Sequence, residues 1–207
     1  MEAQVDRRPY AEGAEQKAVL TGLLVGVLVV GIDSTIVATI LPRMLSEFGD
    51  LPLAPWVFAS YMLMQISSAP ILGKLSDRFG RKRVLLFGLF TFLLGSELIA
   101  FSRSFGELIL FRGLQGIGAG AILPAALATL FLDFPPEMRP RLQGNFSAVY
   151  GVSNILGPLL GAVLAEHVGW RYAFHINIVF VSISAYCISR SLRDTRGSHR
   201  KGQLDWA

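Results

Sequence analysis

Long apolar runs separated by short polar links dominate this chain of 207 residues. Six runs occur, at residues 18–41, 54–72, 84–101, 105–131, 146–165 and 170–189. Each is close to the ~20 residues that an α-helix needs to cross ~30 Å of hydrocarbon. The pattern predicts an all-α membrane protein with six transmembrane helices in one bundle, residues 18–189. Polar segments at residues 1–17 and 190–207 flank the bundle.

Composition favours a membrane protein over a soluble one. Hydrophobic residues make up 52% of the chain and charged residues 16%, which is more apolar surface than a soluble core of this length could bury. Aromatic residues near the ends of several runs fit anchoring at the membrane interface. They are Trp56, Tyr61, Phe101, Phe105, Trp170 and Tyr172.

The placement of lysine and arginine predicts the orientation of the bundle. Residues 1–17, the link at 73–83, the link at 139–141 and residues 190–207 hold 15 of the 19 Lys and Arg residues. The three opposite links hold only Arg43, Arg103 and Arg171. Loops rich in these residues stay cytoplasmic, so both termini are predicted to be cytoplasmic. Because the cations lie in short loops and not on one face, nucleic acid is not an expected partner.

The link at residues 73–83 carries the densest charge and is a candidate gate loop on the cytoplasmic side. Gly73 and Gly80 are predicted to mark the points where the backbone leaves one helix and enters the next. Asp77 precedes Arg81 by four residues, the spacing that brings side chains together on one helical face. Arg78 adds to the basic character of the link. The alternative is that this link only fixes topology.

Three ionisable residues lie inside predicted spans, where charge is costly and by default functional: Asp33, Glu97 and Arg112. Asp33 and Arg112 are both predicted ~10 to 12 Å below the outer surface, at 1.5 Å per residue. If the first and fourth helices face each other, the two charges can pair and lower each other's burial cost. Gln115 lies one turn deeper on the same face. A proton or a cationic substrate at Asp33 would weaken this pair.

Less specific roles remain open for each of these charges. Asp33 could be held by local hydrogen bonds with Ser34 or Thr35. Arg112 could extend towards the outer surface. Glu97 lies ~6 Å from the outer end of its helix and is expected to reach the interface.

Small residues recur in the fourth and fifth runs. Gly116 and Gly120, like Gly157 and Gly161, have the GxxxG spacing that permits close helix approach. Pro158 removes a backbone hydrogen bond and favours a kink. Close packing and gating are both compatible with these residues. Shifting the chain by 89 residues also aligns five identical residues, a weak signal of two inverted three-helix repeats.

These motifs resemble the major facilitator superfamily over nearly the whole chain. Residues 73–83 resemble the signature between its second and third helices. Residues 32–42, 108–119 and 170–177 resemble motifs of the first, fourth and sixth helices in the fourteen-helix drug/proton antiporter branch. Gly157, Pro158 and Gly161 resemble the antiporter motif of the fifth helix. The chain departs from the family pattern at Ala38, Ser153 and Ala162.

The resemblance implies the N-terminal half of a major facilitator fold in a bacterial cytoplasmic (inner) membrane. It implies a transmembrane transporter that couples efflux of drugs or other small lipophilic molecules to proton entry. Asp33, Arg112 and Gln115 would carry the coupling, and Asp77 and Arg81 would brace two halves of the transporter. The expected partners are a small-molecule substrate and the lipid bilayer, with the proton gradient as energy source and no cofactor. Residues 200–207 resemble the approach to a seventh helix, so the cytoplasmic segment at 190–207 would lead toward a missing second half.

Other classes fit less well. A truncated, non-transporting remnant is the main alternative, and a six-helix unit could also work as a homodimer or with a second half-transporter. A membrane enzyme is disfavoured because His167, His175 and His199 have no metal-ligand spacing and no nucleophile motif is evident. The phosphate loop of an ATP-driven transporter is also missing. The identity of the substrate stays open.

Overall fold

Nearly every described residue of the chain is helical. The computed structural model describes residues 13–192, so parts of the predicted polar segments at 1–17 and 190–207 lie outside the described residues. The helices are α1 (Ala14–Phe48), η1 (Leu51–Leu53), α2 (Ala54–Phe79), α3 (Arg81–Ala100), α4 (Phe105–Asp133), η2 (Pro136–Met138), α5 (Arg139–His167), α6 (Tyr172–His175) and α7 (Asn177–Ser191). The all-α class predicted from the apolar runs is confirmed.

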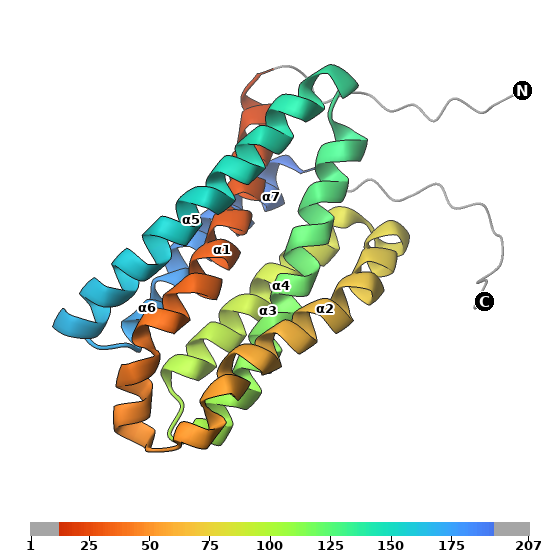
Figure 1. Ribbon diagram of the computed structural model, residues 1–207. Coiled ribbons are helices and arrows are strands. Elements are labelled where there is room, and N and C mark those ends of the chain that lie inside the picture. The colour runs from red at the N-terminus through yellow and green to blue at the C-terminus, as the bar shows by residue number, and fades with distance from the viewer. Residues whose placement is uncertain (1–12, 193–207) are drawn as a thin grey trace, which may run out of the picture.

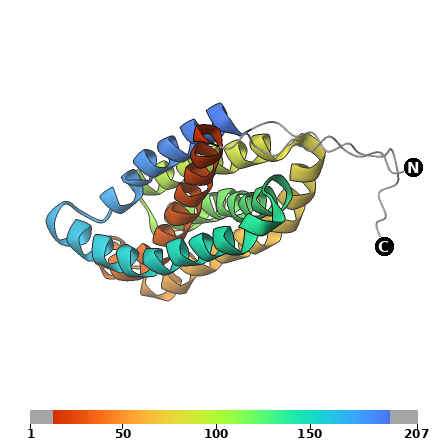
Figure 2. The ribbon, with the colours of Figure 1, turned by 90° about the horizontal axis from the view of Figure 1, so that it is seen from above.

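The long helices form one elongated bundle (Figure 1). Helix α4 packs between α2 and α3, and α1 packs between α5 and α7. The view from above shows α1 lying between α5 and α7 (Figure 2). Helices α1 and α4 therefore occupy central positions in their two groups, which lets side chains from both reach the middle of the bundle.

Polar contacts tie the helices together at each end of the bundle. At the end that contains Gly80, called here the Gly80 end, Arg81 Nη1 lies 2.6 Å from Asp133 Oδ1. At the opposite end, called the Trp170 end, Arg171 binds both carboxylate oxygens of Glu47 at 2.7 and 2.8 Å. Trp170 Nε1 donates to the same carboxylate at 2.8 Å. These pairs join helix ends that are far apart in the sequence.

Five helical segments within residues 13–192 are long and apolar enough to cross a membrane. They contain α1, α3, α4, α5 and α7, so five of the six predicted spans are confirmed by length and composition. Helix α2 has 26 residues and is long enough as well. Gln65, Ser67 and Ser68 lower its mean hydropathy. The sixth span therefore remains a prediction.

Several predicted boundaries are wrong. The first predicted span ends at residue 41, but α1 continues through Pro42 to Phe48. The predicted gate loop is helical except at Gly80, because α2 runs to Phe79 and α3 begins at Arg81. Gly73 lies inside α2 and ends no helix. Gly80 alone makes the turn, with φ = 98°, a conformation that costs glycine little.

The apolar core divides into two main clusters along the bundle axis. One contains Val19, Val30 and Leu142 and lies towards the Gly80 end. The other contains Ile32, Met44 and Trp170 and lies towards the Trp170 end. Neighbouring residues of α1, Val30 and Ile32, belong to different clusters, so the level of Asp33 is where the two clusters meet.

Glycines allow the helix backbones to approach closely. A Cβ atom on Gly116 would overlap the Tyr61 backbone, and one on Gly120 would overlap Ser68 Oγ, both on α2. On the other side of α4, a Cβ on Gly118 would overlap the Phe92 backbone of α3. The predicted GxxxG spacing in α4 therefore serves packing against α2.

Candidate functional site

Asp33 lies in the middle of α1 and is only 1% exposed. The neighbouring hydroxyls do not hold its carboxylate: Ser34 Oγ donates to Gly31 O at 2.8 Å. Thr35 Oγ1 lies within 3.3 Å of the carbonyl oxygens of Gly31, Ile32 and Ser153. The alternative of local hydrogen bonding at Asp33 is therefore wrong, and the carboxylate faces partners on other helices.

Arg112 on α4 is the main partner of Asp33. Its Nη1 atom donates to Asp33 Oδ2 at 2.6 Å. Its Nε atom donates to Val57 O at 3.3 Å, and its guanidinium carbon lies 4.2 Å from the centroid of the Tyr61 ring. Arg112 is 1% exposed, so the alternative in which it extends towards the outer surface is wrong. The guanidinium is held by α1 and α2 as well as by its own helix.

Gln115 closes a ring of hydrogen bonds with these two charges. Its Oε1 atom accepts from Arg112 Nη1 at 2.6 Å, and its Nε2 atom donates to Asp33 Oδ1 at 2.7 Å. A carboxamide can do both because it carries an acceptor and a donor on one planar group. Asp33, Arg112 and Gln115, the three residues predicted for coupling, are thus brought together.

Asn177 and Ser96 extend this network on the α3 and α7 side. Asn177 Nδ2 lies 3.4 Å from Asp33 Oδ1 and 2.7 Å from Ser96 Oγ, to both of which it donates. Ser96 Oγ donates to Phe174 O at 3.0 Å. All these donors and acceptors are buried. Asp33 therefore accepts hydrogen bonds from α4 and α7.

Three residues of this network are not predicted from the sequence: Asn177, Ser96 and Tyr61. Asn177 stands in a motif that carried the family resemblance, and a carboxamide at the start of an apolar run was a usable signal. Ser96 gave none, because serine is common in transmembrane helices. The prediction that Tyr61 is an interfacial anchor is wrong, because Tyr61 is 3% exposed and its ring lies against Arg112.

The electrostatics of this site are those of a buried ion pair. Removing one partner of such a pair lowers the free energy of unfolding by about 3–5 kcal/mol, because the other charge stays buried without a partner. The hydrogen bonds from Gln115 and Asn177 to Asp33 reduce that penalty, since each satisfies part of the carboxylate. The site can therefore hold two opposite charges in the interior of the bundle.

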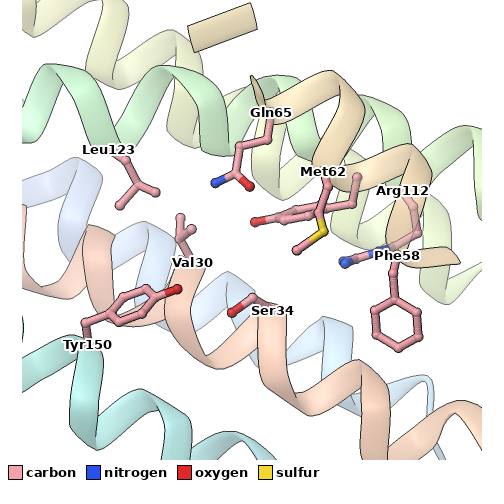
Figure 3. Close-up of a pocket in the computed structure, with 9 residues that line it drawn as sticks. Val30, Ser34, Phe58, Met62, Gln65, Arg112, Leu123 and Tyr150 are labelled. Atoms are coloured by element: carbon pink, nitrogen blue, oxygen red, sulfur yellow. The ribbon is translucent and has the colours of Figure 1, made fainter. Parts of the chain in front are cut away.

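A cavity of about 90 Å³ opens beside Arg112. Figure 3 shows Met62 and Gln65 of α2, Ser34 of α1 and Tyr150 of α5 directed into the space between these helices. The complete lining is Val30, Ser34, Phe58, Tyr61, Met62, Gln65, Arg112, Leu123 and Tyr150. It combines aromatic rings, a thioether and a few polar groups, as small-molecule sites do, in a volume well below the ~300–1,000 Å³ of a complete site.

The predicted antiporter motif of the fifth helix packs directly against α1. A Cβ atom on Gly157 would overlap Thr35 Oγ1, and one on Gly161 would lie about 3.0 Å from Ile36. Pro158 lies within α5, which continues through it. The motif therefore lies two to three residues along α1 from Asp33, on a contact between α1 and α5.

Ser153, a departure from the family pattern, is accommodated by a glycine on the facing helix. A Cβ atom on Gly31 would lie 2.6 Å from both Cβ and Oγ of Ser153. Ser153 Oγ donates to Val149 O at 2.8 Å and to Leu28 O at 3.3 Å. The hydroxyl thus adds a polar contact between α5 and α1.

The residues predicted for the gate loop are only partly arranged as expected. Because Gly80 interrupts the helix, Asp77 and Arg81 do not share a helical face, and that prediction is wrong. Arg81 pairs with Asp133 of α4 instead. Asp77 is exposed, and the Arg78 guanidinium lies 5.4 Å from the centroid of the Phe79 ring.

Glu97 does not simply reach the surface. Its Oε2 atom lies 2.9 Å from His175 Nδ1, and the two side chains are 26% and 30% exposed. Its neighbour Ser96 belongs to the Asp33 network. Among residues 13–192, no group of three or more His, Cys, Asp or Glu residues is suited to hold a metal ion.

A helical bundle of apolar spans with a buried charge network beside a cavity defines a polytopic membrane protein of the transporter class. Comparison with known proteins supplies the family. The chain matches the Major Facilitator Superfamily over residues 23–204, and it belongs to that family. The resemblance stated from the motifs is thus confirmed, and the family's members are membrane transporters.

Its curated relatives include exporters. The chain is 44% identical over 196 residues to "Multidrug resistance protein 3" of Bacillus subtilis (strain 168), covering 95% of this chain and 38% of the relative. It is 35% identical to "Multidrug transporter protein MdtP" of the same organism, covering 94% of this chain and 36% of the relative. It is 37% identical to "Tetracenomycin C resistance and export protein" of Streptomyces glaucescens, over 77% of this chain. The chain spans less than two fifths of the length of these relatives.

Proposed function

We propose that this chain carries the proton-coupling part of an antiporter that exports small lipophilic molecules. The observation that carries the proposal is the buried ion pair of Asp33 and Arg112, 2.6 Å apart on different helices. Relatives whose names describe multidrug transport and tetracenomycin C export support the substrate class. The energy source is the proton gradient, without a bound cofactor.

In this proposal the carboxylate of Asp33 is the proton acceptor. A proton that binds there removes the negative charge and converts the ion pair into a weaker contact between a cation and a neutral acid. Arg112 stays partly satisfied, because Gln115, the Val57 carbonyl and the Tyr61 ring remain in contact with it. The carboxylate can therefore change its charge while the guanidinium stays in place.

This change is transmitted to helix packing through α1. Asp33 belongs to α1, whereas Arg112 and Gln115 belong to α4. A weaker ion pair lowers the free energy that holds α1 against α4, which favours the arrangement in which the helices separate. The contact at Gly157 and Gly161 places α5 on the same helix, so α5 would move with α1.

The residues that line the cavity next to Arg112 would form one wall of the substrate site. Phe58, Met62 and Leu123 supply apolar contacts, and Gln65 and Tyr150 supply polar ones. A lipophilic cation could bind these groups and compete with Arg112 for Asp33. In the family the site lies between two six-helix halves, so a second half, in the same chain or in another, would complete it. A homodimer is the other arrangement that would do so.

The membrane orientation follows from the basic residues. Arg81 and Lys82 lie at the Gly80 end, as does Asp133, which pairs with Arg81. We place this end in the cytoplasm of a bacterial cell, with both chain termini on that side. Helix α2 is the sixth span, and two inverted three-helix repeats make up the bundle.

The test is the variant Asp33→Asn in the full gene product, expressed in inverted membrane vesicles. Proton-driven uptake of ethidium, a fluorescent lipophilic cation, should be lost in this variant. The matched control is Asp50→Asn, which changes an exposed aspartate after the end of the same helix and should leave uptake unchanged. Proton-driven uptake that is as fast in Asp33→Asn as in the parent would refute the proposal.

A further inference from the structure

We propose that Glu97 and His175 form a pH-responsive staple that positions Asn177 against Asp33. The staple is defined here as Ser96 and Glu97 of α3 with Phe174, His175 and Asn177 of the α6–α7 segment. The inference rests on the proposed function, in which Asp33 is the proton acceptor. It adds two residues, Glu97 and His175, that act on Asp33 through Asn177 and do not touch it.

Two consecutive residues of α3 hold the segment that carries Asn177. Ser96 Oγ donates to Phe174 O at 3.0 Å and accepts from Asn177 Nδ2 at 2.7 Å. Glu97 binds His175 at 2.9 Å. Helix α6 has only four residues, so it has little intrinsic stability of its own. Its position is therefore set by these contacts with α3 and by the buried Phe174 side chain.

Aromatic rings fix the His175 side chain at the Trp170 end. The rings of Phe101 and Tyr172 lie edge-to-face with the imidazole, with centroids 5.6 and 5.7 Å away. Glu97 Oε1 is buried and, among the described residues, has no hydrogen-bond partner. The carboxylate therefore depends on His175 for its one strong contact.

The groups around His175 come from several elements. Helices α3, α5 and α7 pack against α6. The imidazole contacts two titratable groups, Glu97 of α3 and Tyr172 of α6 itself. The end of α5 carries Glu166 and His167, both exposed. Glu97 is the acid that pairs with His175, so the charge of His175 decides the strength of their contact.

Histidine gains a proton as the pH falls through the neutral range. A protonated His175 forms an ion pair with Glu97, which is a stronger contact than a hydrogen bond from a neutral imidazole. Acidity at the Trp170 end thus tightens the staple and holds Asn177 in place to donate to Asp33. At higher pH the staple weakens, and the 3.4 Å hydrogen bond from Asn177 to Asp33 is the contact that is lost first.

The consequence concerns how easily Asp33 takes up a proton. A hydrogen bond to a carboxylate stabilises its charged form. With the staple tight, Asp33 keeps all its donors and favours the charged form. With the staple loose, it has one donor fewer and is more easily protonated. Glu97 and His175 are thus positioning residues for the carboxylate.

Labelling of Asp33 by dicyclohexylcarbodiimide tests this directly, because this apolar reagent reacts with protonated carboxyl groups. The full gene product is purified in detergent, and labelling of Asp33 is quantified by peptide mass spectrometry at pH 6 and pH 8. The variants are His175→Phe, which keeps a ring between Phe101 and Tyr172, and Glu97→Gln. The matched control is His167→Phe, an exposed histidine at the end of α5.

At pH 6, Asp33 should be labelled about threefold faster in His175→Phe than in the parent, which is the effect of losing one long hydrogen bond to a carboxylate. The ratio used below is the labelling rate in the variant divided by that in the parent. At pH 8 the ratio should be close to one, because the staple is already weak in the parent. Glu97→Gln should also raise the labelling rate at pH 6. If His175→Phe does not fold, the labelling of Glu97→Gln tests the proposal in its place. His167→Phe should give a ratio of one at both pH values.

Two results would overturn the proposal. A ratio of one at both pH values would mean that the staple does not reach Asp33. A raised ratio that is equal at pH 6 and pH 8 would mean that the contact is purely structural. Labelling needs no transport, so its outcome is independent of the transport test. Normal proton-driven uptake in Asp33→Asn would refute the proposed function, whereas the two labelling results above would refute the staple.

Discussion

The strongest energetic prediction concerns the free energy that links Asp33 and Arg112. The perturbations are Asp33→Leu, Arg112→Met and the double variant, compared in a double-mutant cycle. Both side chains of the pair are at most 1% exposed, so each single change leaves an uncompensated buried charge. Each should lower the free energy of unfolding by about 3–5 kcal/mol.

The double variant should be much less destabilised than the sum of the singles. Replacing both members of a buried pair by apolar side chains of similar size is often close to neutral. Gln115 loses both hydrogen-bond partners in this variant, so part of the loss in unfolding free energy remains. We therefore expect an interaction free energy of at least about 3 kcal/mol between the two sites, at or above the upper end for residues in contact.

The assay is reversible unfolding of the purified protein in mixed micelles, followed by circular dichroism as the denaturing detergent is increased. The internal control is the ion pair of Glu47 and Arg171, whose side chains are 42% and 34% exposed. The same cycle with Glu47→Gln and Arg171→Gln should give about 1 kcal/mol or less. An equal interaction free energy for the two pairs would refute the reasoning from burial.

Two further changes test the packing and the Gly80 end. Gly157→Ala should destabilise the protein by about 1–3 kcal/mol, because its Cβ would overlap Thr35. Gly144→Ala on the same helix meets open space, and it should be neutral or stabilise by up to ~1 kcal/mol; equal effects in thermal unfolding would contradict this. Arg81→Gln should cost about 1 kcal/mol or more through loss of its contact with Asp133, and this cost should be smaller in an Asp133→Asn background. An equal cost in both backgrounds would mean that this contact does not supply it.

The sequence predicted the centre of the site because depth in a membrane can be counted along a helix. Asp33 and Arg112 lie in separate apolar runs, and a buried charge needs a partner. Since a residue advances a helix by a fixed rise, the comparison of depths was meaningful even with uncertain ends. Their contact at 2.6 Å agrees with that expectation.

What could not be predicted depends on helix rotation and on details of the helix ends. Counting along a run does not say which neighbour a side chain faces, so Tyr61 was misplaced at the interface and Ser96 was missed. The spacing of Asp77 and Arg81 was interpreted as one helical face, but Gly80 divides it between two helices. The first predicted span ends before Pro42, yet α1 contains it. These differences arise from tertiary packing, which periodicity does not encode.

The contact between Gly31 and Ser153 has a consequence for how this chain can be recombined with others. Side-chain volume is shared across the α1–α5 seam, with the smaller residue on one side and the larger on the other. Exchanging α5 for a homologous segment with glycine at position 153 would leave a gap, whereas exchanging α1 for one with alanine at position 31 would force the two segments apart. Chimeras should therefore inherit both segments from the same parent.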